Sequence, residues 1–91
     1  MMKRIRDNKN ERWIKMKSIK ELTFRSAPGY KFFLHKAYKE NGFTISEETT
    51  GFAVTIASSK TAAIESARKI LKYIGGERFD SLVAEALKTI Y

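Results

Sequence analysis

The chain has 91 residues, of which 43% are hydrophobic and 12% aromatic, with no cysteine and a formal net charge of +8 at pH 7. This length allows one domain with one modest core, and the composition argues against global disorder. The absence of cysteine excludes disulfides and thiolate metal sites, and no apolar run approaches the ~20 residues that a membrane span needs. We therefore expect a soluble cytoplasmic protein that does not bind a membrane. Its positive charge favours an anionic partner.

The first 20 residues carry most of the positive charge, since their net charge is +6. Few of the first ten residues are apolar, so we expect residues 1–17 to form a basic, partly mobile arm. Residues 18–91 then form a single α/β domain. Trp13 lies among cations, where its ring can stack on an unpaired base or pack back on the domain.

Two interpretations of residues 12–25 stay open. Leu22 and Phe24 alternate with polar residues, which favours a strand at about 20–25 beside a later hairpin. Ser18 and Glu21 have the spacing of a capping box, which favours a short helix instead. We prefer the strand, because a sheet of only two strands is marginally stable by itself.

The segment SAPGYKFFLHKAYKENG predicts a helix over about residues 28–40. Its apolar residues recur at helical spacing and form one stripe of Tyr30, Phe33, Leu34, Ala37 and Tyr38. A proline suits the first turn of this helix, and a glycine suits its end.

The opposite face of this predicted helix carries the main candidate site. Lys31, His35 and Lys39 follow one another at intervals of four residues, with Lys36 beside them. Cations stacked at that spacing repel one another by about a few tenths of a kcal/mol per pair. We interpret this face as a contact for phosphates. The alternative is that an exposed helix tolerates four basic groups in water.

The segment GFTISEETTGFAVTIAS predicts a β-hairpin with strands at about 43–48 and 51–57. Period-two alternation indicates strands with one buried face. The residues expected on that face are Phe43, Ile45, Phe52, Val54 and Ile56. Gly51 can adopt the positive φ that a tight turn requires.

Two helices are predicted after the hairpin, over about residues 60–74 and 77–91, because apolar residues again recur at helical spacing. Only two glycines separate them, which favours a tight helical hairpin. Lys60 lies at the start of the first helix, where the dipole prefers an anion, and a bound phosphate would resolve this mismatch. The expected fold is a small two-layer α+β domain, in the order helix, β-hairpin and helical hairpin. Whether a third strand precedes the first helix stays open.

The hairpin followed by SSKTAAIESARKIL resembles the later part of a double-stranded-RNA-binding domain, whose last helix opens with Ser, Lys and closely spaced Ala. Ser59, Lys60, Ala62 and Ala63 match that opening, and the resemblance covers about 30 residues. The family has three strands between its helices and several lysines at the helix start, whereas two strands and one lysine are predicted here. We therefore carry no functional residue across from it.

No group of residues predicts catalysis. His35 is the only histidine, and its helical neighbours are lysines, so no carboxylate orients it as a base. The ligands of a zinc site are missing, and the glycines lack the spacing of a phosphate-binding loop. We expect no enzymatic activity, no metal and no cofactor.

The function we expect is that of a small nucleic-acid-binding or regulatory protein, which contacts DNA or RNA phosphates with little sequence preference. The candidate contacts are Lys31, His35, Lys36, Lys39 and Lys60, with Lys3, Arg4, Arg6, Lys9, Arg12 and Trp13 of the arm. The alternative is a non-enzymatic adaptor or inhibitor of an acidic protein surface, with Phe32, Tyr73 and Tyr91 as aromatic anchors. Homodimer formation and the natural start at Met1, Met2 or Met16 stay open.

Overall fold

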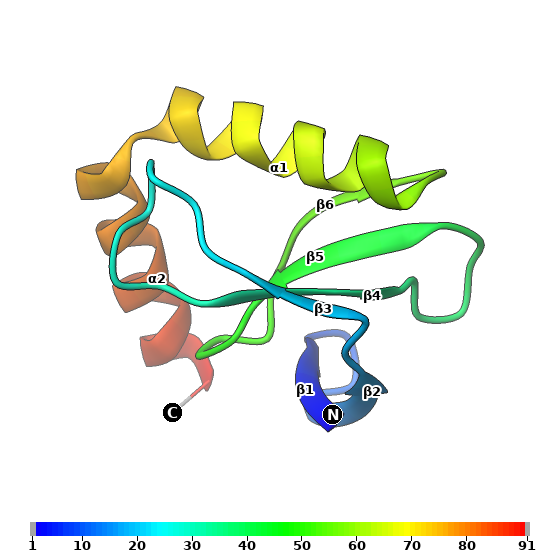
Figure 1. Ribbon diagram of the computed structural model, residues 1–91. Helices are drawn as coiled ribbons and strands as arrows, with labels where there is room; N and C mark the ends of the chain where they lie inside the picture. Colours follow the sequence, from blue (N-terminus) through cyan, green and yellow to red (C-terminus); the bar gives the residue numbers. More distant parts are fainter. Residues whose placement is uncertain (1, 91) are drawn as a thin grey trace.

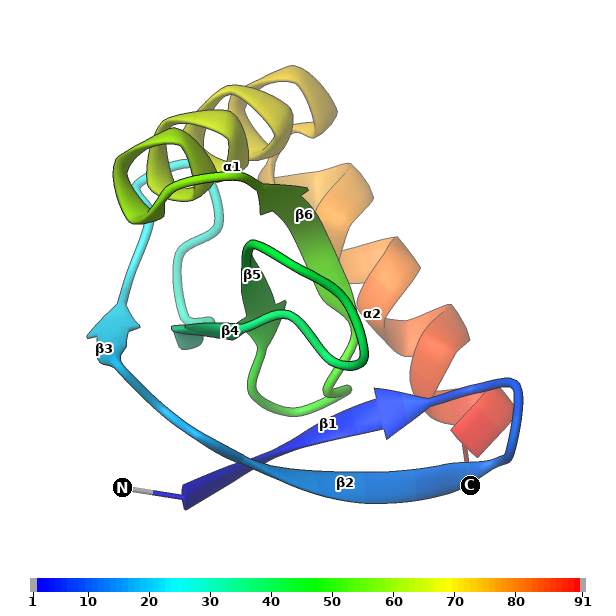
Figure 2. The ribbon, with the colours of Figure 1, turned by 90° about the vertical axis from the view of Figure 1, so that its right-hand side faces the viewer.

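The structure is a computed structural model that describes residues 2–90. Six strands precede two helices along the chain, as Figure 1 shows: β1 (Met2–Asp7), β2 (Arg12–Lys17), β3 (Lys20–Leu22), β4 (Phe32–Lys36), β5 (Phe43–Glu47), β6 (Ala53–Ala57), α1 (Lys60–Ile74) and α2 (Gly76–Ile90). Strands β3 to β6 form one antiparallel sheet in sequence order, and β1 and β2 form a separate hairpin. The sheet lies between the helices on one side and the β1–β2 hairpin on the other (Figures 1 and 2).

The predicted helix over residues 28–40 is wrong, and so is the fold class that placed a helix first. These residues contain β4, the central strand between β3 and β5. Residues 32–35 are four consecutive buried residues, because the helices cover one face of β4 and the hairpin lies against the other. A strand that is buried on both faces reads as an apolar run, which periodicity alone does not separate from a helix.

The later elements confirm their predictions. The strands of the predicted hairpin are β5 and β6, the helix expected at 60–74 is α1, and the last helix is α2. Ser59 caps α1 by accepting a hydrogen bond from the backbone N–H of Ala62 at 3.1 Å. The strand that we preferred near residue 20 is β3, which ends at Leu22. One detail is wrong: Ile56 is 46% exposed, because a register irregularity between β5 and β6 shifts the alternation.

The main core lies between the sheet and the two helices. Phe32 and Leu34 of β4 pack with Ile45 of β5, and α1 and α2 cover them with Ala63, Ala67, Leu71, Phe79 and Val83. The ring of Phe32 contacts the rings of Phe24 and Phe79, with centroids 5.2 and 5.8 Å away. Burying one such side chain contributes about 1.5–3 kcal/mol, so this cluster dominates the stability of the fold.

The β1–β2 hairpin closes the other face of the sheet. Ile5 of β1 is buried, and β2 lies against β4. The backbone N–H of Arg6 donates to the carbonyl oxygen of Gly51, at 2.8 Å, which fastens β1 to the turn before β6. A Cβ atom on Gly51 would lie 2.7 Å from the Arg6 nitrogen and 2.7 Å from the Trp13 ring, so only glycine permits this approach. Residues 2–17, which we expected to belong to an arm, form a hairpin that packs against the sheet.

Candidate functional site

Alternation divides the hairpin into two faces of different chemistry. Residues directly opposite in the antiparallel register share a face, and Ile5 is paired with Ile14 on the face toward the sheet. The other face carries Arg4 opposite Lys15 and Arg6 opposite Trp13, with Met2 opposite Lys17 at its end. None of the six residues on this face is acidic. Arg4, Lys15 and Lys17 are exposed, whereas Arg6 and Trp13 are half-buried, since the Trp13 ring also lies against Gly51. We call the residues Arg4, Arg6, Trp13, Lys15 and Lys17 the cationic face.

Trp13 organises this face. The guanidinium carbon of Arg4 lies 4.4 Å from the centroid of the Trp13 ring, and that of Arg6 lies 5.3 Å from it. Both distances fall within the range of cation–π attraction, which holds the two arginines side by side. Among the ion pairs formed within residues 2–90, none involves a cation of this face.

Two more lysines extend the positive surface beyond Lys17. Lys17 lines a pocket of about 600 Å³ together with Lys36, from the end of β4, and Lys60, from the first turn of α1. Apolar side chains including Phe43 complete the lining, which contains no carboxylate. The Lys60 ammonium lies 5.7 Å from the centroid of the Phe43 ring. Three lysines from distant parts of the sequence thus converge at the end of the cationic face.

Other predicted contacts are engaged within the protein. The Lys3 ammonium forms ion pairs with Glu21 at 2.8 Å and Glu48 at 3.3 Å, and the hydrogen bond to Glu21 raises the pKa of Lys3. Arg12 donates from Nε to Asp7 at 3.3 Å and from Nη2 to the hydroxyl of Tyr38 at 3.1 Å. Lys3 and Arg12 therefore lie outside the cationic face and support the position of the hairpin.

The stripe of Lys31, His35 and Lys39 does not exist, because it depended on the helix that is absent. Lys31 is exposed just before β4, and Lys39 lies in the following turn at φ 61°. Lys9 is exposed in the turn between β1 and β2. His35 is 1% exposed and does not face solvent as a phosphate contact would.

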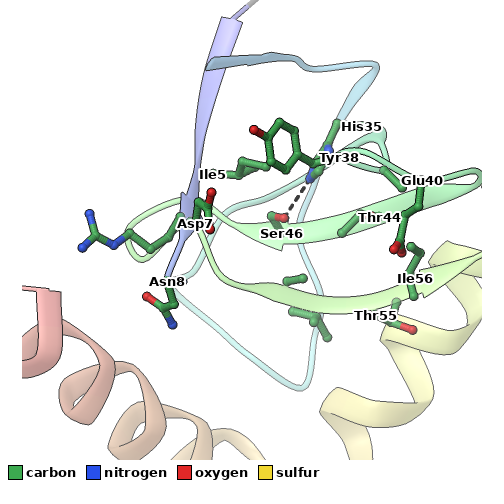
Figure 3. Close-up of a pocket in the computed structure, with 15 residues that line it drawn as sticks. Ile5, Asp7, Asn8, His35, Tyr38, Glu40, Thr44, Ser46, Thr55 and Ile56 are labelled. Carbon is green, nitrogen blue, oxygen red and sulfur yellow. Dashed lines mark hydrogen bonds between the residues drawn. The ribbon is translucent and has the colours of Figure 1, made fainter. Parts of the chain in front are cut away.

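His35 instead forms the floor of a second pocket, of about 400 Å³, between β1 and the sheet (Figure 3). Its Nε2 atom lies 2.8 Å from the hydroxyl of Ser46, and its Nδ1 atom lies 2.7 Å from the backbone oxygen of Lys36. Burial lowers the pKa of His35. Two carboxylates, of Asp7 and Glu40, line this pocket beside one cation, Arg6, so its charge does not favour a phosphate.

Sequence reasoning missed Lys15 and Lys17 as site residues. The signal was present in two short stretches, where an apolar residue lies between two cations: Ile5 between Arg4 and Arg6, and Met16 between Lys15 and Lys17. Asp7-Asn8-Lys9-Asn10 between the two strands is typical of a turn. The net charge of the segment does not show this alternation, so the hairpin was not predicted.

No family model, curated protein or solved structure matches this chain. Among residues 2–90, no three His, Asp or Glu side chains lie close enough to hold a metal ion. Within the same range, neither helix has the length and apolarity to cross a membrane.

The aromatic anchors considered for a protein partner have different environments. Phe32 is fully buried in the core, so it is not available as an anchor. Tyr73 is 90% exposed on α1. Tyr91 lies outside the described residues.

Proposed function

We propose that the protein binds nucleic acid through the phosphate backbone, using the cationic face together with Lys36 and Lys60. The observation that supports this is the pairing of Arg4 with Lys15 across β1 and β2, on a face without a carboxylate. Like charges directly opposite each other in a sheet destabilise it. An arrangement that costs stability and aligns cations is typical of a surface that receives an anionic partner.

The chemistry of this surface favours contact with phosphates over the reading of bases. The two-stranded hairpin presents its cations side by side on one face. Contacts between such cations and phosphates position a protein on nucleic acid without specifying sequence. The Trp13 ring is half-buried against Gly51 and lies under Arg4 and Arg6, so it positions the two arginines for phosphates instead of offering a free face to a base. We therefore expect binding with little sequence preference.

The test is fluorescence anisotropy with labelled double-stranded DNA, double-stranded RNA and single-stranded DNA, over about 50 to 200 mM salt. The variant Arg4→Gln/Lys15→Gln removes two cations from the cationic face. Its matched control, Lys69→Gln/Arg78→Gln, removes one lysine and one arginine from exposed positions on α1 and α2, in the helical layer across the sheet. The salt slope of log K should fall by about 2 in the first variant, since each lost phosphate contact reduces it by about 1.

Two results would contradict the proposal. Equal loss of affinity in both variants would mean that net charge alone attracts nucleic acid and that the hairpin is not its site. No binding to any of the three nucleic acids at low salt would leave an acidic protein surface as the partner to seek.

A further inference from the structure

The pocket at the end of the cationic face is built from three separate elements. Lys17 is the last residue of β2, Lys36 is the last residue of β4, and Lys60 is the first residue of α1. All three are exposed, and they line one cavity of about 600 Å³. Of the described residues that line this cavity, none is acidic, and the ion pairs formed within residues 2–90 include none of the three lysines. The fold thus brings three lysines to one cavity that has no carboxylate.

This convergence is unfavourable unless an anion binds. Like charges that lie together repel one another, and no acidic side chain of the cavity offsets them. Lys60 has a second disadvantage, because it lies at the start of α1, where the helix dipole prefers a negative charge. The first turn of α1 has no acidic residue. An anion held among the three lysines would remove the repulsion between them.

One wall of the same pocket is apolar. Met16, Ile19 and Phe43 form it, and Ile19 is 40% exposed. The backbone N–H of Ile19 donates to the carbonyl oxygen of Leu34 at 2.7 Å, which fixes this wall to β4. An inorganic phosphate would leave the wall in water, whereas a phosphate that carries a sugar and a base would cover it, which is favourable. The volume falls within the range of about 300–1,000 Å³ that is usual for small-molecule sites, so one nucleotide has room.

The grouping of the lysines favours a phosphate with more than one negative charge. A phosphodiester within a strand carries one negative charge, and the cations side by side on the hairpin match a series of such groups. A phosphomonoester carries a charge of about −1.5 to −2 at pH 7, because its second pKa is about 6. Three lysines around a single cavity match this larger charge. A phosphomonoester occurs where a strand ends.

We propose that this pocket binds the phosphorylated end of a nucleic-acid strand, with the terminal phosphate among Lys17, Lys36 and Lys60 and the terminal nucleoside against the apolar wall. The inference rests on the proposed function, because the rest of the strand follows the cationic face, which Lys17 joins to the pocket. A free mononucleotide has no further phosphates for Arg4 and Lys15. A strand end is therefore the ligand that uses both parts of the surface.

Fluorescence anisotropy tests this inference with one single-stranded oligonucleotide, labelled at an internal base, in three forms: with a 5′-phosphate, with a 3′-phosphate and without a terminal phosphate. At about 100 mM salt, we expect at least one phosphorylated form to bind about fivefold tighter than the unphosphorylated form, which is the effect of one good exposed ion pair. Lys36→Gln/Lys60→Gln should bring this ratio close to one. The matched control, Lys69→Gln/Lys88→Gln, also removes two exposed lysines and should keep the ratio.

The outcomes separate this inference from the proposed function. Equal binding of all three forms by the wild type would overturn the inference and leave the proposed function standing, whereas no binding of any form would overturn both. A preference that survives in Lys36→Gln/Lys60→Gln would show that the terminal phosphate binds elsewhere. Adenosine monophosphate that binds as tightly as the phosphorylated oligonucleotide would refute the assignment to a strand end.

The pH dependence of the ratio provides a second measurement. A phosphomonoester loses its second charge as the pH falls through about 6, whereas a phosphodiester does not. The preference for the phosphorylated form should therefore be smaller at about pH 5.5 than at about pH 7.5. The unphosphorylated form, measured at the same pH, corrects for any loss of folded protein. No histidine occurs among the described residues of the pocket, so the change follows the phosphate itself. A ratio that is the same at both pH values would rule out a phosphomonoester in the pocket.

Discussion

The imidazole of His35 bridges two groups within the sheet, with Nδ1 2.7 Å from the Lys36 carbonyl oxygen and Nε2 2.8 Å from the Ser46 hydroxyl. A carbonyl oxygen only accepts, so Nδ1 carries the proton and Nε2 of the neutral ring accepts from Ser46. Protonating Nε2 would replace this acceptor with a donor in a buried site. His35 is thus a structural histidine whose neutral form the fold requires.

We predict that the free energy of unfolding falls as the pH drops through the titration of His35. Burial lowers the folded-state pKa below the ordinary value of 6.5, so the unfolded chain binds the proton more tightly. The contribution is therefore present above pH 6.5 and is lost as the pH falls toward the folded-state pKa, with a limiting slope of about 1.4 kcal/mol per pH unit. Urea denaturation at about pH 8, 6.5 and 5 measures it.

His35→Gln is the control for this pH dependence, because its amide can also form hydrogen bonds but does not titrate. We expect the variant to be less stable than wild type near neutral pH and to lose less stability on acidification. The same pH dependence in both proteins would assign the effect to carboxylates elsewhere and refute the role given to His35.

We predict that Gly51→Ala detaches the hairpin from the sheet. The residue has φ 69°, and a new Cβ atom would lie 2.7 Å from both the Arg6 nitrogen and the Trp13 ring. Trp13 is the only tryptophan, so its fluorescence reports directly on this contact. We expect a red-shifted emission and a loss of about 2 kcal/mol or more, since the strained backbone and the clash add.

Gly29→Ala separates these two effects. Gly29 also has positive φ, 86°, but nothing lies within 4 Å of its Cβ position. We expect this variant to lose about 1 kcal/mol with unchanged tryptophan emission, because it has the backbone strain without the clash. Equal losses in both variants would show that docking of the hairpin does not depend on Gly51.

The sequence predicted the second half of the fold much better than the first. The helices at 60–74 and 76–90 each bury one stripe of residues against the sheet, so helical periodicity was a sufficient signal. β4 has no such signal, because both of its faces are covered and Phe32, Phe33, Leu34 and His35 are all buried. What decides between helix and strand here is the long-range pairing with β3 and β5, which local pattern does not contain.

The candidate site was predicted only in part, because the fold decides which cations lie together. The predicted contacts Arg4, Arg6, Trp13, Lys36 and Lys60 lie on one basic surface, but this depends on the register of β1 and β2 and on the packing of β4 against α1. The same charge run contains Lys3, which pairs internally with Glu21. A charge count assigns all these cations equal weight, whereas the fold divides them between internal ion pairs and the cationic face.

We predict that Tyr30 ionises later than an ordinary tyrosine. Its hydroxyl donates to Oδ1 of Asp80 at 2.7 Å, and this hydrogen bond raises the pKa of Tyr30 to about 12. The neutral phenol is favoured in the folded state, so its contribution is present below about pH 10 and is lost as the pH rises toward about 12. Alkaline titration followed by phenolate absorbance should show one tyrosine that titrates late, and Tyr30→Phe should remove that step. Retention of the step in Tyr30→Phe would assign it to another tyrosine.

The last prediction contrasts two cations that are neighbours in sequence. Lys3 and Arg4 lie on opposite faces of β1: Lys3 pairs with Glu21 and Glu48, whereas Arg4 lies over Trp13 on the cationic face. If that face binds phosphates, Arg4→Gln should weaken nucleic-acid binding and lower the salt slope by about 1 with little change in stability. Lys3→Gln removes the same charge but should mainly lower the thermal midpoint, because it leaves two carboxylates without their partner. Anisotropy and thermal denaturation of both variants measure the two effects, and an equal loss of affinity would mean that the faces of the hairpin do not differ in function.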